Sequence, residues 1–471
     1  MKDYRGIRTG LSPEENPLYY RGPGGLILVG PARSGKARDI LTTAILDWPY
    51  SLVGADSKGE LASLTDRRRQ QFGDVHYLDP YRVLSEFLPC AKPSHYNPMS
   101  RLNPLAPDFV AHADKTGEGL IADEGKDDIH NHFTLGARGA VAGLQMGLAL
   151  HHVPEERNLS AVRSIITGAF EGLDVFSFAA KMMVESQHLA LRKRLAKFCV
   201  RKPTESKSLA DIIQTCDVQT QFLDDPAVAE TLSASDFSFA DLKKRVGTVY
   251  IVTPLTFASD SKYTRVVIAS ALSELLSTPR GVPVLIILDE FCNLGKLSAV
   301  QAAMSMAAGL GVQLWPVIQD LDQLAGVYEN WRTFLANAGV QIFLPPRDEK
   351  TSQYLSGLCG QGERRRLSKN ISYPNEAEHD DGERQTPKGI KRPATRPVSR
   401  PAQINFGFTS TPRPLLSPDE ARALGDDEMI LMVDSVKAPI RAKRRPYWEE
   451  KDLEGTWGQN PYEETKDHEE T

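Results

Sequence analysis

The stretch GGLILVGPARSGKARDILTTAILDW, residues 24–48, decides the fold of this chain. Its apolar run ends at Gly30, and the chain then passes through Gly35 and Lys36 into a helical pattern, which predicts a strand, a phosphate-binding loop and a helix. The glycines allow successive backbone N–H groups to face an anion, and the lysine reaches the β and γ phosphates of a nucleotide. The predicted nucleotide-binding residues are Gly30, Pro31, Ala32, Arg33, Ser34, Gly35, Lys36 and Ala37.

Ala37 stands where this loop pattern usually has serine or threonine, whose hydroxyl binds Mg²⁺. One magnesium ligand is therefore missing from the loop. A short glycine-rich pattern without this hydroxyl is also compatible with an ordinary turn. The nucleotide hypothesis thus needs a second motif.

The stretch VLIILDE, residues 284–290, supplies that second motif. Its short apolar run predicts a buried strand, and Asp289 and Glu290 follow at the C-terminal end, where ligands bind in parallel α/β sheets. We expect Asp289 to hold Mg²⁺ through water and Glu290 to polarise the attacking water as a base. The alternative is a strand that ends in two solvated acids, and the presence of both motifs in one chain argues against it.

Further strand patterns occur at 51–55, 75–80, 246–254, 312–320 and 340–346, with helical segments between several of them. This alternation predicts an α/β fold with a mostly parallel sheet covered by helices. Gln319 comes at the end of one of these strands. We expect its amide to sense the γ-phosphate or to orient water, the alternative being a surface glutamine.

Composition limits the class of protein. The chain has 471 residues, which is room for two or more domains, and its net charge of −5 requires any DNA contact to come from local basic patches. No apolar run approaches the roughly 18–20 residues of a membrane span, and the N-terminus lacks a signal-peptide core. We therefore expect a cytoplasmic protein in a reducing compartment. Five cysteines without CxxC spacing argue against zinc and disulfides: Cys90, Cys199, Cys216, Cys292 and Cys359.

The motif order predicts a domain plan with a helical insertion. Strand signals are almost absent from 129–242, whose helical periodicity predicts an all-α domain. Its histidines (His130, His132, His151 and His152) have spacings that do not place two rings on one helical face, so surface or capping roles are favoured over a metal site. The expected units are an extended lead-in at 1–23, a nucleotide-binding domain at 24–128 (turn-rich from 97 to 126) and 243–447, the insertion at 129–242, and an acidic tail at 448–471 that is disordered or docks a partner.

Two features near the C-terminus complete the plan. Residues 362–411 are poor in apolar side chains and rich in arginine, which predicts a flexible basic segment that either is a solvated linker or contacts phosphate backbones. MILMV at 429–433 predicts a returning edge strand.

The ordered set of motifs resembles the VirD4/TraG family of type IV secretion coupling proteins, the conjugative DNA-transfer ATPases. This resemblance implies a RecA-like P-loop NTPase that uses ATP and Mg²⁺, has an inserted all-α domain in contact with a relaxase–DNA substrate, and is hexameric when active. The matching stretches are GPARSGKA around Lys36, LVGADSKGE at 52–60, YLDP at 77–80, YNPMSRLNP at 96–104, IILDEF at 286–291, VIQDLDQLAGVYENW at 317–331 and RPLLSPDEARAL at 413–424.

The chain departs from the family pattern in two ways. Family members commonly begin with transmembrane helices, so this chain is expected to be a soluble member, either cytoplasmic or held at the inner membrane by a separate anchor subunit. Residues 291–318 contain no arginine that could act on a neighbouring subunit's γ-phosphate, and Arg332 or Arg347 could take that role. The leading hypothesis is an ATP-driven translocase that delivers DNA, a relaxase–DNA complex or secreted proteins to the secretion channel. The alternative is a nucleotide-binding substrate receptor or adaptor with little motor activity.

Overall fold

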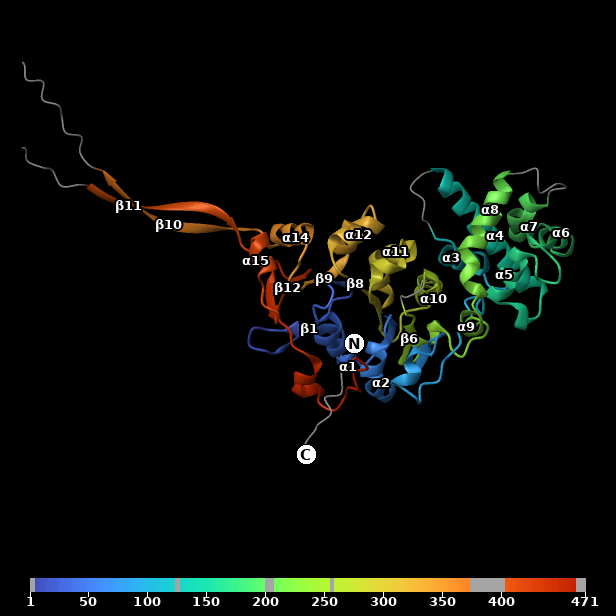
Figure 1. Ribbon diagram of the computed structural model, residues 1–471, viewed down its shortest axis with the longest axis horizontal. Coiled ribbons are helices and arrows are strands. Elements are labelled where there is room, and N and C mark those ends of the chain that lie inside the picture. Colours follow the sequence, from blue (N-terminus) through green and yellow to red (C-terminus); the bar gives the residue numbers. More distant parts are fainter. Residues whose placement is uncertain (1–4, 123–127, 200–206, 255–257, 373–402, 463–471) are drawn as a thin grey trace, which may run out of the picture.

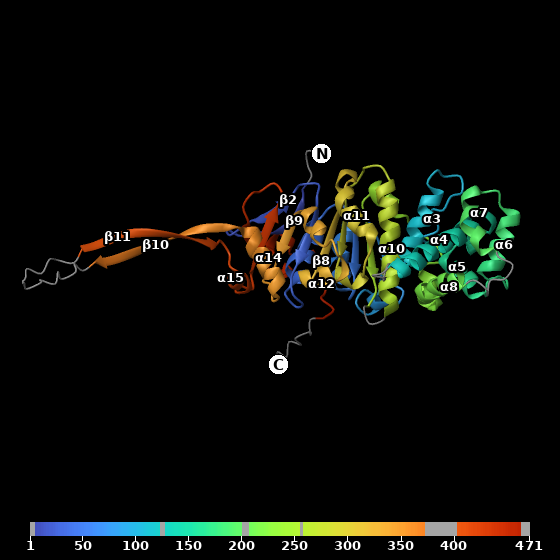
Figure 2. The same cartoon turned by 90° about the horizontal axis from the view of Figure 1, so that it is seen from above.

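The computed structural model describes residues 5–122, 128–199, 207–254, 258–372 and 403–462. Figures 1 and 2 show three parts in a row, a long two-stranded ribbon, a sheet flanked by helices, and a helical region. The described strands of the central part form one eleven-stranded sheet in the order β2-β1-β13-β12-β9-β3-β8-β7-β4-β6-β5. Their bounds are β1 (Ile7–Leu11), β2 (Pro17–Tyr20), β3 (Gly25–Val29), β4 (Ser51–Asp56), β5 (Asp74–Leu78), β6 (Gly247–Val252), β7 (Val284–Leu288), β8 (Val312–Ile318), β9 (Ala338–Phe343), β12 (Glu428–Val433) and β13 (Ile440–Lys443).

The strands from β9 to β5 run parallel, as the sequence predicts for a helix-covered sheet. Successive residues of β3 belong to two different cores because side chains alternate across a strand. Leu26 and Leu28 join the core beneath the helices that follow β3, whereas Ile27 and Val29 join the larger core on the opposite face. This burial on both faces explains the continuous apolar runs of the central strands.

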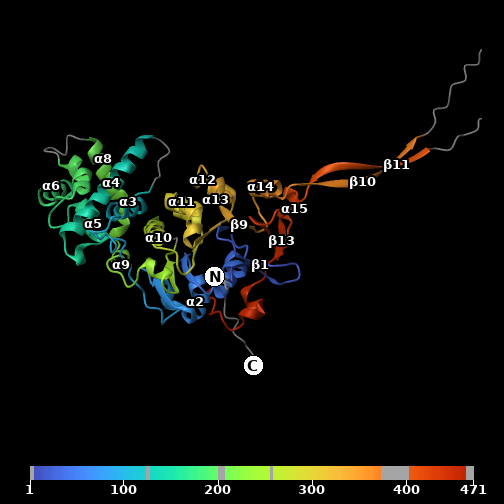
Figure 3. The same ribbon diagram turned by 180° about the vertical axis from the view of Figure 1, so that it is seen from behind.

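Helices cover both faces of the sheet (Figures 1 and 3). On one face lie a π-helical turn η1 (Lys36–Leu41), α1 (Thr42–Asp47) and α2 (Glu60–Phe72). On the other face lie α10 (Ala258–Ser277), α11 (Ser298–Met306), α12 (Leu321–Val327), α13 (Arg332–Ala336) and α14 (Glu349–Cys359), with α15 (Pro418–Arg422) against α14.

The antiparallel side of the sheet differs from the sequence prediction. Residues 1–23, expected as an extended lead-in, contribute β1 and β2, and β1 pairs with β13. The stretch 429–433, expected as an edge strand, lies within β12 and pairs with both β9 and β13. The ends of the chain thus extend the parallel sheet together.

A helical region is packed beside α10. Its first helix, α3 (Phe109–Leu120), contacts both α10 and α4, although the sequence predicts only turns from 97 to 126. Among the described helices, none is both long and apolar enough to cross a bilayer. The further helices are α4 (Asp128–His151), α5 (Leu159–Thr167), α6 (Val175–Glu185), α7 (Leu189–Leu195), α8 (Lys207–Thr220) and α9 (Pro226–Thr231).

The ribbon consists of β10 (Gln361–Ser372) and β11 (Gln403–Pro414), which pair antiparallel along their whole length. The flexible segment expected at 362–411 therefore has regular structure at both ends, and residues 373–402 lie outside the described part. Leu415 donates a backbone hydrogen bond to the Gly360 carbonyl at 2.9 Å, so the ribbon leaves and re-enters the body at one place.

The C-terminal segment also differs from the expected disordered or partner-docking tail. Its described part packs against α1 and α2, with Leu453 buried in a small core. Gly458 donates a backbone hydrogen bond to the Leu64 carbonyl at 2.8 Å, and the Tyr462 hydroxyl donates to the Lys58 carbonyl at 2.6 Å. Residues 463–471 lie outside the described part.

Candidate nucleotide site

The loop between β3 and η1 has the backbone that an anion-binding loop requires. Gly35 has φ of 83°, and a Cβ at this position would lie 2.5 Å from the Asp39 carboxylate. Any larger residue would therefore be strained by its backbone and by this contact. Lys36 begins the helix directly afterwards, so the helix N-terminus faces the loop. Gly30 packs so closely on Leu344 that an added Cβ would lie 2.8 Å from that side chain.

The Lys36 side chain lies inside the loop. Its ammonium donates to the carbonyls of Gly30 at 2.8 Å and Pro31 at 3.0 Å. Burial lowers the pKa of Lys36, and the negative charges of Asp289 and Glu290 act in the opposite direction. The lysine therefore lies within electrostatic reach of the acid pair, although more than 240 residues separate them in the sequence.

Sheet order brings these groups together. β8 lies between β3 and β7, so the two strands are separated by two inter-strand spacings, on the order of 10 Å. Because all three strands are parallel, the loop, Gln319 and the acid pair follow the same edge of the sheet. Loss of hydration raises the pKa of Asp289 to about 6, and the neighbouring Glu290 adds to this shift. A divalent cation would relieve both effects.

Glu290 is held by two amides. Its Oε2 accepts hydrogen bonds from Gln319 Nε2 at 3.0 Å and from Asn293 Nδ2 at 3.1 Å. The Glu290 backbone is left-handed, with φ of 50°, a conformation that costs about 1 kcal/mol or more for a residue other than glycine. The carboxylate of this backbone-strained residue thus accepts the amide hydrogen bond of Gln319. Sequence reasoning identified Gln319 and missed Asn293.

Asp56 is a second buried acid that sequence reasoning missed. It ends β4, the strand beside β7, and it accepts a backbone hydrogen bond from Ala62 at 2.9 Å. Burial raises the pKa of Asp56 to about 7, and the charge of Asp289 adds to the effect. The sequence places Asp56 in a turn beyond a strand, and its position at the strand end was the available signal.

Arg444 also escaped the sequence analysis, and it reaches the loop from the other end of the chain. Its guanidinium donates to Asp39 Oδ2 at 2.6 Å and to the Ser34 carbonyl, and both charged side chains are almost fully buried. Arg38 Nε pairs with the other oxygen of Asp39 at 2.5 Å. No local sequence pattern predicts a contact between two residues that are 405 positions apart.

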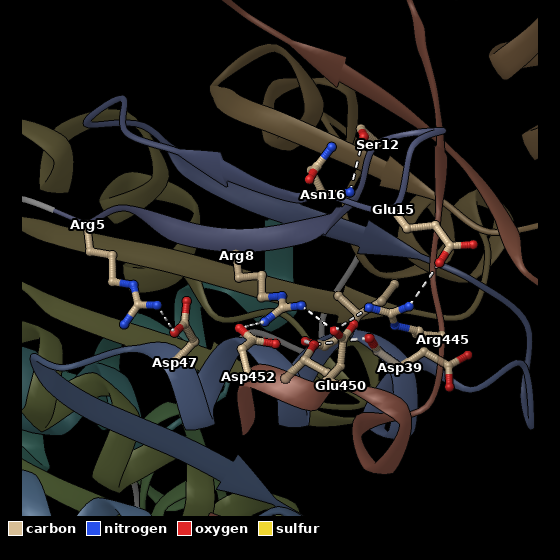
Figure 4. Close-up of polar contacts among 12 residues, drawn as sticks. Arg5, Arg8, Ser12, Glu15, Asn16, Asp39, Asp47, Arg445, Glu450 and Asp452 are labelled. Atoms are coloured by element: carbon tan, nitrogen blue, oxygen red, sulfur yellow. Dashed lines mark hydrogen bonds and ion pairs between the residues drawn. The ribbon is translucent and has the colours of Figure 1, made fainter. Parts of the chain in front are cut away.

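The next residues tie the same segment to β1 (Figure 4). Arg8 pairs with Glu450 at 2.5 Å and with Asp452 at 2.8 Å, and Arg445 pairs with Glu450 at 3.0 Å. Arg445 also reaches Glu15 at 3.2 Å. The chain that leaves β13 is therefore fixed against the first strands before it crosses the helices.

The loop fits a nucleotide phosphate. The Ser34 hydroxyl is buried and has no hydrogen-bond partner among the described residues, which leaves its hydrogen-bonding capacity unused within the loop. Ala32 and Arg33 are exposed, whereas Lys36 and Ala37 are partly covered. The predicted binding residues thus make up the loop after β3 and the start of η1: Gly30, Pro31, Ala32, Arg33, Ser34 and Gly35, then Lys36 and Ala37.

Other predicted candidates lie elsewhere. The described residues contain no cluster of three metal-ligating side chains, and a magnesium ion held by Asp289, phosphates and water would need none. His152 contacts Glu156 and the Phe178 ring, so it is a packing residue and not a surface residue. The Arg332 guanidinium lies 4.5 Å from the Trp331 ring centroid, and Arg347 is exposed after β9. A role for either arginine on a neighbouring subunit stays a prediction.

Comparison with known proteins shows the family of this chain. Residues 14–469 match the family model described as Type IV secretory system Conjugative DNA transfer. The chain belongs to this family. Protein VirD4 of Agrobacterium fabrum is 25% identical over 440 residues, which cover 91% of this chain and 59% of VirD4. Conjugal transfer protein TraG of Escherichia coli is 26% identical over 426 residues, covering 86% of this chain and 62% of TraG.

Solved structures agree with the family in fold. Plasmid coupling protein TrwB in complex with ADP and Mg²⁺ superposes with a TM-score of 0.60 at 15% identity, covering 93% of each chain. The RecA-like P-loop NTPase fold expected from the sequence is therefore confirmed. This chain spans about three fifths of the length of the curated family members that it matches.

Proposed function

We propose that this chain is the ATP-hydrolysing part of a type IV secretion coupling protein, which delivers DNA, a relaxase–DNA complex or secreted proteins to the secretion channel. The observation that supports the proposal is the meeting of Lys36, Asp289, Glu290 and Gln319 at one sheet edge in a member of the conjugative DNA-transfer family. Titratable groups whose pKa values are shifted by burial and by one another, as those of Lys36 and Asp289 are, cluster at functional sites.

Each residue has a distinct proposed role. Lys36 would leave its two carbonyl partners to bind the β and γ phosphates. Asp289 would hold Mg²⁺, which supplies positive charge that stabilises the phosphate oxygens during transfer. Glu290 would accept a proton from the attacking water. Gln319 would keep that carboxylate in place, because its amide already donates to Glu290.

Assembly and partners follow from the family and remain part of the proposal. We infer a homo-hexamer in the active state, in which a neighbouring subunit supplies the missing arginine. DNA, relaxase or effector substrates and secretion-channel components are the proposed partners, and a membrane-anchored subunit could hold the complex at the inner membrane. Sedimentation with and without DNA tests whether the homo-hexamer forms.

Lys36→Ala tests the site. We expect it to abolish DNA-stimulated ATP hydrolysis and to leave the thermal unfolding midpoint unchanged, because the Lys36 ammonium bonds only to carbonyls of the loop in this structure. Lys115→Ala is the matched control, since Lys115 is an exposed lysine paired with Glu118 on α3. Hydrolysis that persists unchanged in Lys36→Ala would rule out this site.

The adaptor alternative predicts a different result. The absence of arginine between residues 291 and 318 favours it, because hydrolysis in ring ATPases depends on such a charge. An adaptor would bind ATP and change its oligomeric state, but turnover would stay low with single-stranded and with duplex DNA. Measuring turnover and mass in the same sample separates the two functions.

A further inference from the structure

Trp448 is a large aromatic residue at an unusual place. It is 41% exposed, whereas Trp48, Trp315 and Trp331 are buried. The preceding Tyr447 is buried and contacts the indole edge-on, with the ring centroids 4.9 Å apart. The Arg38 guanidinium lies 5.8 Å from the Trp448 ring centroid. An exposed indole therefore lies beside Arg38, two residues after Lys36.

We propose that Trp448 and Arg38 form the surface on which the base of the bound nucleotide stacks, an inference that rests on the proposed nucleotide binding at the loop. The indole supplies an aromatic face, and the guanidinium supplies a planar cation. Both groups attract the π-face of a base. Stacking of this kind tolerates any base, so this surface favours nucleotides over inorganic phosphates without selecting strongly among purines.

The direction of the nucleotide supports this assignment. Its terminal phosphate end is fixed by Lys36 and by Asp289 and Glu290, which lie on the β7 side of β3. The base must then lie toward the opposite side. On that side the sheet continues through β9, β12 and β13, and β13 leads directly into the segment that carries Trp448.

The segment is anchored to the loop itself. Arg444 contacts the Ser34 carbonyl and Asp39, and Asp39 in turn pairs with Arg38. The same carboxylate thus holds the guanidinium of the proposed stacking surface and the arginine that fixes the Trp448 segment. Movement of Trp448 away from the loop would require breaking a buried ion pair.

The test compares the binding of two ligands to the unmodified chain and to two variants. Binding of ATP and of inorganic tripolyphosphate, each with Mg²⁺, is measured by calorimetry on the full chain, on Trp448→Ala and on Trp448→Phe. We expect Trp448→Ala to weaken ATP about tenfold, within the usual range for loss of one stacked base. Tripolyphosphate affinity should change less than about twofold, because the loop contacts are intact. Trp448→Phe should recover most of the ATP affinity.

Two results would overturn the inference. Unchanged ATP affinity in Trp448→Ala would show that the indole does not touch the base. An equal loss for both ligands would show that Trp448 supports the loop and not the base. Failure of the unmodified chain to bind either ligand is a separate result, which would refute the proposed nucleotide site itself.

Discussion

Arg444 and Asp39 form a buried ion pair, 2.6 Å between Nη1 and Oδ2, that joins the residue directly after β13 to η1, the helix of the phosphate loop. Burial lowers the pKa of Arg444, and the Asp39 charge opposes this shift. Removing one partner of such a buried pair is destabilising, because the other partner would remain as a charge without hydration.

Removing one partner should therefore be costly. We expect Arg444→Ala to lower the free energy of unfolding by about 3 kcal/mol, because Asp39 keeps only Arg38 as a partner. Nucleotide affinity should fall as well, since the Ser34 carbonyl loses its donor. Urea unfolding and calorimetry measure the two effects.

Arg441→Ala is the control for Arg444→Ala. Arg441 lies in β13, three residues before Arg444, and pairs with Glu428, but its side chain is 66% exposed. Exposed pairs contribute about 0–1 kcal/mol, so stability should hardly change. Equal losses for the two arginines would contradict the special role of the buried pair.

The pH dependence of stability should report on Asp289. Because its pKa is raised to about 6, the folded protein keeps a proton that the unfolded chain loses near pH 4. This group therefore lowers stability as the pH rises from about 4 to 6. We expect Asp289→Asn to stabilise the nucleotide-free protein by about 2 kcal/mol at pH 7.5, but not at pH 4. Urea unfolding of the two proteins at pH 7.5 and at pH 4 tests this prediction.

Magnesium should reverse that trend in the unmodified protein. The ion and the proton compete for the same carboxylate, so Mg²⁺–nucleotide should stabilise the protein above pH 6 and much less at pH 5. Asp289→Asn should remove this difference. A magnesium effect that is independent of pH would show that Asp289 does not hold the ion.

The amide of Gln319 should matter for turnover more than for binding. Gln319→Ala leaves the Glu290 carboxylate with Asn293 alone, and we expect kcat to fall about 10²-fold while KM for ATP changes little. Steady-state kinetics with saturating DNA measure both constants.

Gln353→Ala is the matched control for Gln319→Ala. The Gln353 amide donates to Glu349 at 2.7 Å on the exposed surface of α14. Its loss should leave kcat unchanged. If Gln319→Ala instead raised KM and spared kcat, Gln319 would act in ATP binding and not in positioning Glu290.

The ribbon offers a test of DNA contact. Its sequence from 362 to 413 has more basic than acidic residues, although the whole chain carries −5. Because Gly360 and Leu415 are hydrogen-bonded neighbours, a short glycine-serine turn can replace residues 362–413. We expect nearly unchanged stability, weaker DNA binding at low salt and a shallower dependence of affinity on salt. An identical salt dependence would exclude the ribbon as a phosphate contact.

The sequence was sufficient for the parallel half of the sheet. Strands β3, β7 and β8 are continuous apolar runs buried on both faces, and each is followed directly by a residue of the candidate site: Gly30, Asp289 and Gln319 respectively. For that reason the sequence predicted four residues of the candidate site: Lys36, Asp289, Glu290 and Gln319.

The antiparallel half of the sheet was harder to predict from the sequence. β1 and β2 are short, and a register shift occurs between Arg8 and Gly10, where the Gly10 position faces Met429. Such segments carry too little periodicity to be recognised as strands. Arg444 was missed because its contacts join distant parts of the chain, which no local pattern encodes. Asp56 was missed although its position at the end of a strand was an available signal.

The pairing of β1 with β13 has a consequence for biosynthesis. The phosphate loop is translated early, whereas the arginine that holds it follows 405 residues later. At ribosomal speeds of about 5–20 residues per second, that interval is on the order of 20–80 s. A nascent chain therefore carries a loop without its anchor and a first strand without its neighbour. β13 and Arg444 complete both once they have been translated.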